Sequence, residues 1–538
     1  MRLWHRKEWI YMFSQSLTAM LLKGIAGKIS ESMFLGIICK FLKAAGKFIE
    51  KLYGLFQKSI LFGIFLTLTG ALKKLYNGSG LKCYVDAENF FDKPWSESGL
   101  ARIADVIIRG LTYLAEKIGD FIKRLFCGSF ILSVYDTAME KLGFHRILAI
   151  VFGAMFLVYS SIWNNLYAAG ICVILLFLLL YKNRKTALAP SNIDFFMVLF
   201  LISLVLGVIS APIKGDAVRI ALIAASALGF HLCTVVILDD NKKIVDFIKI
   251  MSWVMALTAV VAIYQRLSGI EVDPEFVDVM VNAGMPGRVF STFENPNNYA
   301  ELLVLFMPFM YALILNEKGA KQKLIWIAVA GISAIALAMT YSRSCYVAFA
   351  LATVIFICVY DYRLLLPFAI LCICAIPFLP QTILNRIMTI GSLQDSSNSY
   401  RLYIWDTCIK LVRNYGVSGL GVGPKAFSAY YRPIAYKNAA TAPHSHMLYL
   451  ELILEYGILG FIGFIGYYIR IIRNGFKSVK IASKEERAYI GAGIGALIGI
   501  AFVSCAEYIW FYPRDMFAHL IVLGILAALV RNIGKKGE

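Results

Sequence analysis

Charge is scarce in this 538-residue chain. Only 16% of its residues are charged, against 59% that are hydrophobic. A soluble domain of this length could not cover its surface with so few charges, and the composition also excludes disordered, collagen-like and disulfide-rich secreted proteins. Several apolar runs are long enough to cross a bilayer, for which a helix needs about 20 residues. The sequence therefore predicts an integral membrane protein.

Cysteine and histidine motifs for metals are also missing. The 11 cysteines lie mostly in or beside apolar runs, and none forms a CxxC or His-rich pattern. We therefore expect neither disulfides nor structural zinc. No nucleotide loop or acidic metal cluster is evident, so no cofactor is expected. The basic N-terminal segment has no clean apolar core followed by a small-residue cleavage site, and we expect no cleaved signal peptide.

The charges that are present are mostly positive. Lysine and arginine number 53 against 34 aspartates and glutamates, which gives a formal net charge of +19. In a soluble protein this excess would point to nucleic acid. Beside apolar spans it is typical of the positive-inside bias and of attraction to anionic headgroups. We therefore expect membrane lipid, and no nucleic acid, as a partner.

Residues 147–538 carry the membrane-spanning pattern, which predicts an all-α polytopic protein with about twelve transmembrane helices. The predicted spans are 147–163, 165–181, 193–211, 217–238, 244–265, 298–315, 324–340, 344–360, 364–380, 447–472, 488–510 and 515–530. If they alternate, basic breaks such as 182–185 and 473–487 lie on one face, which places both termini in the cytoplasm. The loop 381–445 then lies outside the cell membrane, and its length indicates a function.

Residues 1–146 have a different pattern, because lysine or arginine interrupts the apolar runs every few residues. We predict a cytoplasmic or interfacial region of amphipathic helices here. Within 103–126, apolar residues such as Ile103, Ile107 and Leu114 recur on one helical face, and most charges lie off it. This helix could lie in the membrane interface or pack against its neighbours, and the sequence leaves both possibilities open.

Polar clusters at the outer ends of the predicted spans form the candidate site, because charge at the membrane boundary is costly without a function. The clusters are Gly287–Asn298, Tyr341–Ser344, Ser399–Trp405 with Gly419–Pro424, and Pro443–Gly457.

These clusters contain arginines and histidines that suit one reaction. Guanidiniums stay charged and their fork matches phosphate oxygens, so Arg288, Arg343 and Arg401 could grip a diphosphate. As single residues they could instead be interfacial anchors. His444 or His446 could accept a proton from a hydroxyl nucleophile, whereas a spacing of two is poor for a shared metal. Together the groups predict attack by a hydroxyl on a sugar that is linked to a lipid diphosphate.

At these residues the chain resembles the O-antigen ligase/polymerase superfamily of bacterial membrane glycan transferases. The resemblance covers about 190–530 and rests on Arg288-Val-Phe-Ser-Thr-Phe-Glu-Asn-Pro-Asn-Asn-Tyr-Ala, the Ser342-Arg343 hairpin, the Arg401…Trp405…Gly-Val-Gly-Pro loop and His444-Ser-His446…Glu451…Glu455-Tyr-Gly. It implies a GT-C-like fold and metal-independent glycan transfer from an undecaprenyl-diphosphate carrier. The implied place is the outer face of a bacterial cytoplasmic membrane, and the implied acceptor is a glycan, a lipid or a protein.

The resemblance also implies roles for single residues. Arg288, Arg343 and Arg401 would bind the diphosphate of the carrier. His446 would be the base, but Met447 follows it where the family commonly has asparagine, which keeps His444 as an alternative. The competing function is a transporter or flippase for the same lipid-linked oligosaccharide. Because a transporter should place its basic groups in a mid-membrane cavity, we favour the enzyme.

Overall fold

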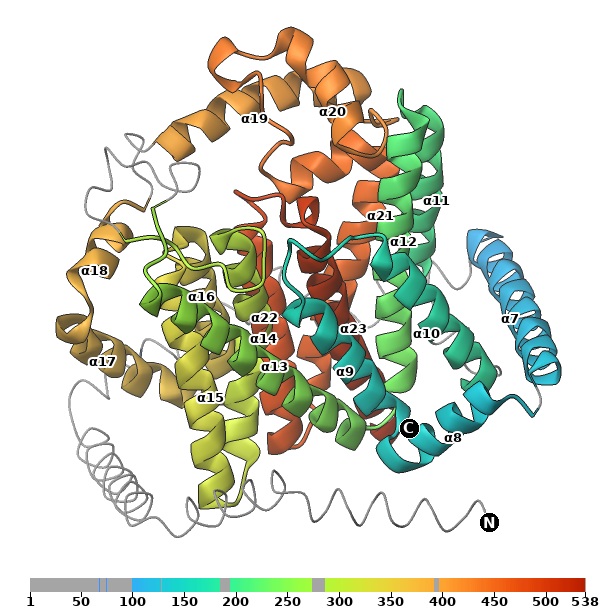
Figure 1. Ribbon diagram of the computed structural model, residues 1–538, viewed down its shortest axis with the longest axis horizontal. Coiled ribbons are helices and arrows are strands. Elements are labelled where there is room, and N and C mark those ends of the chain that lie inside the picture. Colours follow the sequence, from blue (N-terminus) through green and yellow to red (C-terminus); the bar gives the residue numbers. More distant parts are fainter. Residues whose placement is uncertain are drawn as a thin grey trace. The chain divides into compact units, whose positions relative to one another are not determined.

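The computed structural model describes residues 99–126, 128–183, 194–272, 286–390 and 396–537, together with the single residues Thr67 and Lys74. Its contacts divide the chain into two units, residues 1–83 with 318–322 and residues 84–317 with 323–538. Most of the predicted N-terminal region therefore lies outside the described residues. The second unit is described below, and the regular elements in its described part are all helices (Figure 1).

The helices follow one another along the chain with short connections. The first group is α7 Gly99–Leu125, α8 Phe130–Leu142, α9 Phe144–Leu157, α10 Tyr167–Asn183, α11 Phe195–Ser210, α12 Lys214–Ile237, α13 Asn241–Leu267, α14 Pro296–Asn316, α15 Ala320–Met339 and α16 Arg343–Asp361. The second group is η2 Tyr362–Leu364, α17 Leu365–Ala375, η3 Ile376–Phe378, α18 Gln381–Met388, α19 Ser396–Tyr415, α20 Pro424–Tyr431, η4 Arg432–Ile434, η5 Lys437–Ala439, α21 Leu448–Ser478, α22 Lys484–Val503, η6 Ile509–Phe511 and α23 Pro513–Gly537.

Eight helical stretches in the described part are long and apolar enough to span a membrane. They are α12, α13, α14, α15, the stretch Arg343–Phe378 that contains α16 and α17, α21, α22 and α23. Three shorter apolar helices, α9, α10 and α11, accompany them. The prediction of a polytopic helical membrane protein is therefore confirmed, but the predicted number of twelve spans is not. The GT-C-like arrangement stays a prediction.

The difference from twelve spans has two causes. The predicted spans 344–360 and 364–380 form one apolar helical stretch, in which α17 has only 11 residues. The predicted span 147–163 is also shortened, because α9 has 14 residues. At 1.5 Å per residue this is about 21 Å of helix, against a hydrocarbon core of about 30 Å. Hydropathy locates apolar chain, but it does not locate the turns that interrupt a helix.

The predicted amphipathic helix at 103–126 is α7. Apolar side chains on its predicted face are exposed, with Ile103 at 58%, Ile107 at 48% and Leu114 at 53%. The helix and its one-sided apolar pattern are therefore confirmed. Its position in the membrane interface stays a prediction.

α22 packs closely on α16 because two of its residues lack side chains. A β-carbon added to Gly495 would lie 2.5 Å from the carbonyl oxygen of Ala352, and one added to Gly499 would lie 2.9 Å from that of Ala348. Small residues commonly allow such close approach of helix backbones in membranes. These contacts fix the position of α16, which begins at Arg343.

The predicted outer loop 381–445 is folded. It contains α18, α19 and α20, and Figure 1 shows α19 and α20 beyond the ends of α12 and α21. This part of the chain has a small apolar core of its own, which includes Ile404, Cys408, Phe427, Tyr431 and Ala442. The core holds α19, which carries Arg401, against the chain that leads to the two histidines.

Candidate functional site

Arg288 lies in the segment that leads into α14 and is 7% exposed. Its Nε donates to the Thr340 carbonyl (2.7 Å) and its Nη2 to Asn297 Oδ1 (2.5 Å). Asn297 is placed by the start of α14, where Asn295 caps the helix by accepting from the Asn297 N–H (2.9 Å). Burial, and then the charge of Arg386, lower the pKa of Arg288 to about 9. Arg288 is still a cation at neutral pH.

The hairpin between α15 and α16 gathers two further arginines. Arg386 of α18 is buried, and its Nε donates to the Tyr341 carbonyl (3.1 Å). Arg343, the first residue of α16, donates from Nη1 to the carbonyl of Thr389 (3.1 Å), which directly follows α18. Arg343 and Arg386 therefore tie α18 to the hairpin on which Arg288 also rests.

Glu507, in the loop after α22, connects the arginines with the histidines. Its Oε1 contacts Arg401 Nη2 at 2.5 Å and accepts from Asn297 Nδ2 at 3.2 Å. Its Oε2 lies 3.6 Å from His446 Nδ1. Burial alone would raise the pKa of Glu507, but the charge of Arg401 and the contacts with the histidines lower it to about 2. Glu507 is therefore a carboxylate at neutral pH.

The two histidines lie with ring centroids 4.2 Å apart but have different surroundings. His444 is buried against Phe511, and its Nδ1 accepts from the backbone N–H of His446 (3.0 Å). Burial, and then the neighbouring His446, lower the pKa of His444 well below its ordinary value, so its ring is neutral. The His446 side chain is 23% exposed and directs Nδ1 toward Glu507. His446 thus combines partial exposure with a carboxylate partner.

Two carboxylates one turn apart in α21 hold the chain around the histidines. Glu451 Oε2 accepts from the N–H of Ser445 (2.7 Å), and Glu455 Oε1 accepts from the N–H of Gly423 (3.0 Å). Trp405 Nε1 of α19 donates to the carbonyl of Ser445 (3.1 Å). Both backbone groups of the residue between the histidines are therefore fixed, and the Gly-Val-Gly-Pro loop is bound to the same helix.

α21 bends at Gly457, whose backbone has φ 67° and ψ −176°. A β-carbon there would lie 2.5 Å from the carbonyl oxygen of Val417, so the position requires glycine. Just before the bend, the Leu454 carbonyl accepts from the N–H of Leu420 (2.6 Å) instead of continuing the helical pattern alone. The bend therefore docks the segment after α19 onto α21.

Strained backbone marks three of the predicted clusters. Ser291, Tyr341 and His446 are the non-glycine residues of the described chain that have positive φ, at 55°, 52° and 52°. Such conformations cost on the order of 1–3 kcal/mol and are found preferentially at functional sites. Local contacts hold them, as where Gln265 Oε1 accepts from the Ser291 N–H (2.8 Å).

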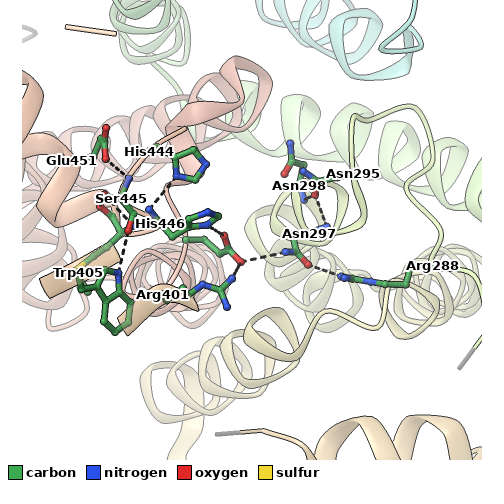
Figure 2. A network of polar contacts seen from close by, with 12 residues as sticks. Arg288, Asn295, Asn297, Asn298, Arg401, Trp405, His444, Ser445, His446 and Glu451 are labelled. Atoms are coloured by element: carbon green, nitrogen blue, oxygen red, sulfur yellow. Dashed lines mark hydrogen bonds and ion pairs between the residues drawn. The ribbon is translucent and has the colours of Figure 1, made fainter. Parts of the chain in front are cut away.

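Figure 2 shows the polar path that these contacts form. The path runs from Arg288 through Asn297 and Glu507 to Arg401 and His446. Three predicted site residues are therefore brought together. His444 joins them through the backbone of His446, whereas Arg343 lies with α18 at the hairpin.

Sequence analysis missed Glu507 and Arg386. Apolar residues on both sides of Glu507 place it in the predicted span 488–510, whereas α22 ends at Val503. An acidic residue inside a predicted span is itself a signal of function, and it could have identified Glu507. Arg386 carries no such signal, because the sequence does not distinguish it from the other charges of the loop.

The groups of the site define what it can do chemically. No set of three or more His, Cys, Asp or Glu side chains is placed to hold a metal ion in the part of the chain that the structure describes. The site offers buried guanidiniums, one carboxylate and one partly exposed imidazole. Such groups can bind an anion and exchange a proton beside it.

These features define a polytopic helical membrane protein with a cationic site at the ends of its helices. Residues 328–465, about a quarter of the chain, match the family model of O-antigen ligase, which confirms the resemblance to the O-antigen ligase/polymerase superfamily. This family implies membrane glycan assembly in bacteria. The matched segment contains Arg343, Arg401 and both histidines, whereas Arg288 and Glu507 lie outside it and are brought to it by the fold. No curated protein matches the chain.

Proposed function

We propose that the protein transfers a glycan from undecaprenyl diphosphate to a hydroxyl of an acceptor, without a metal, on the outer face of the cytoplasmic membrane. The observation that carries this proposal is the path from Arg288 through Asn297 and Glu507 to His446. It sets a group that suits phosphate beside a group that suits proton transfer. The family match over residues 328–465 supports the same chemistry.

On the donor side, Arg288 and Arg343 bind the diphosphate. Negative charge grows on the diphosphate as its bond to the anomeric carbon breaks, and preorganised guanidiniums stabilise that charge. Arg288 is held for this task by the Thr340 carbonyl and by Asn297. The cations of the chain thus take the part that a metal ion has in other transferases.

On the acceptor side, His446 is the base. Glu507 orients the ring by facing Nδ1, which leaves Nε2 to accept the proton of the acceptor hydroxyl. The acceptor oxygen then bonds to the anomeric carbon, and the lipid diphosphate leaves with the electron pair of the broken bond. Arg401 keeps Glu507 charged and orders it, and we assign Arg401 this task first and diphosphate binding second. His444 positions the backbone of His446.

Transfer by the purified protein tests this proposal. The protein in lipid nanodiscs is incubated with an undecaprenyl-diphosphate-linked oligosaccharide and EDTA, without nucleotide, and the glycans are separated on a gel. A ladder of lengths identifies polymerisation, and a single product formed only with an added lipid or protein identifies ligation. His446→Gln keeps an amide in place of the ring but cannot act as a base, and it should lower the rate on the order of 10²- to 10⁴-fold.

The control is Arg432→Ala, because Arg432 is an exposed arginine of the same loop region and should not affect transfer. Arg288→Ala should abolish transfer while membrane insertion is unchanged. Unaltered rates in both His446→Gln and Arg288→Ala would remove the proposed site. Intact donor with every acceptor class would instead favour a transporter.

A further inference from the structure

Arg386 is a buried guanidinium at the edge of the proposed site. It is 6% exposed and belongs to α18, and its Nε donates to the carbonyl of Tyr341 (3.1 Å). Burial of a guanidinium is costly unless hydrogen bonds and opposite charge compensate it. Its place beside the proposed diphosphate site therefore indicates a function for its charge.

Arg386 and Arg288 make the same contact on successive residues of one hairpin. Arg288 Nε donates to the Thr340 carbonyl, and Arg386 Nε donates to the Tyr341 carbonyl. A bond at Nε fixes the plane of a guanidinium and leaves four terminal N–H donors for other acceptors. Arg343 follows two residues later and is bound to the end of α18. Three guanidiniums from separate segments thus meet at the hairpin 340–342.

The electrostatics of the hairpin favour an anion. The charge of Arg386 lowers the pKa of Arg288, which shows that the two cations act on each other. An anion between two buried cations removes their repulsion and part of their desolvation cost. The hydroxyl of Ser342 is also buried and has no hydrogen-bond partner in the described part of the chain. A diphosphate has oxygens on two phosphorus atoms, so it can accept from several guanidiniums at once.

We propose that Arg386 binds the diphosphate of the lipid carrier together with Arg288 and Arg343, and that α18 thereby completes a diphosphate pocket at the hairpin 340–342. This inference rests on the proposed function. A purely structural anchor would need only the bond from Arg386 to the Tyr341 carbonyl. A diphosphate ligand needs the charge and the fork as well, and this difference can be measured.

Binding of undecaprenyl diphosphate to the full-length protein in nanodiscs is the test, because it requires no transfer step. Arg386→Ala should raise the dissociation constant about 10- to 100-fold, as expected for loss of a hydrogen bond to a charged group. Arg386→Lys keeps the charge without the fork, so it should give an intermediate value. Arg386→Gln keeps an N–H donor for the Tyr341 carbonyl but no charge, and it should bind as weakly as Arg386→Ala. Arg432→Ala is the matched control and should bind like wild type.

Two further arms identify the source of the anion. Inorganic pyrophosphate should compete with undecaprenyl diphosphate in wild type, whereas nanodiscs enriched in phosphatidylglycerol should not. Thermal unfolding of each variant in the same nanodiscs separates loss of binding from loss of folding. If Arg386→Ala does not fold, the Lys and Gln variants carry the comparison.

Each result decides one of the two proposals. Wild-type affinity in Arg386→Ala or in Arg386→Gln would overturn the role of Arg386, and so would a wild-type protein that does not bind undecaprenyl diphosphate. If wild type transfers glycan and Arg386→Ala binds and transfers normally, only this inference is lost. If binding depends on Arg386 but no acceptor is glycosylated, the pocket stands and the proposed transferase function is lost.

Discussion

The candidate site has two parts that are built in opposite ways. In the arginine part, formed by Arg288, Arg343 and Arg386 around the hairpin 340–342, side chains are held by backbone carbonyls. In the histidine part, formed by residues 444–446, the backbone is held by side chains, chiefly Glu451. A group that must stay charged can be fixed by its own donors. A group that must gain and lose a proton is better fixed through its backbone, which leaves its ring nitrogens available.

Glu507 is the residue that belongs to both parts. It accepts from Asn297, which binds Arg288, and it faces His446 while it contacts Arg401. Its low pKa keeps it ionised, so it can orient an imidazole and compensate a buried guanidinium at the same time. Removal of its charge should therefore disturb both parts of the site.

Glu507→Gln should have the largest effect. The substitution keeps the shape of the side chain but removes the charge that faces Arg401 and His446, so we expect transfer to fall on the order of 10²-fold or more. The measurement is the initial rate in the nanodisc assay. Glu485→Gln is the matched control, since Glu485 is an exposed carboxylate at the other end of α22. A rate close to wild type in Glu507→Gln would show that the two parts of the site do not depend on each other.

Glu451→Ala should disturb the histidine part alone. It leaves the N–H of Ser445 without its acceptor, which costs about 1–3 kcal/mol for a buried group. We expect transfer to fall about tenfold, because His446 is no longer held, while binding of undecaprenyl diphosphate is kept. Glu451→Gln retains an oxygen for the Ser445 N–H and should be milder. Equal loss of diphosphate binding in Glu451→Ala would contradict the division into two parts.

The sequence predicted the helical membrane class, the clusters and five site residues, because these follow from hydropathy and from costly charges at span ends. It could not predict that α22 ends at Val503, since the apolar residues that follow it look like more span. Glu507 was lost for that reason. The partners of each arginine were also out of reach, because Arg288 and Arg386 meet only through the folding of α18 onto the hairpin.

Gly457→Ala should have a smaller effect that falls on stability first. Alanine at φ 67° is strained, and its β-carbon would lie 2.5 Å from the Val417 carbonyl. We expect a loss of about 1–3 kcal/mol of stability, measured by thermal unfolding in nanodiscs. Gly331→Ala in α15 is the control, because no atom lies within 4 Å of the added β-carbon and alanine favours the helix. A melting temperature in Gly457→Ala equal to that of Gly331→Ala would show that the bend does not hold the histidine part.

The pH dependence of stability offers the smallest effect and separates the two histidines. The pKa of His444 is lowered in the folded protein by burial, whereas in the unfolded chain it is about 6.5. Above that value His444 is neutral in both states and contributes no pH dependence. As the pH falls below it, only the unfolded chain binds the proton, so stability is lost toward acid pH. His444→Asn keeps an acceptor for the His446 N–H but does not titrate. The difference in melting temperature between pH 7.5 and pH 5.5 should therefore be smaller in this variant, and the difference between pH 7.5 and pH 8.5 should be unchanged. Transfer at pH 7.5 should be largely retained. Loss of transfer as complete as in His446→Gln would give His444 a chemical role and would break the distinction between a histidine that positions and a histidine that accepts the proton.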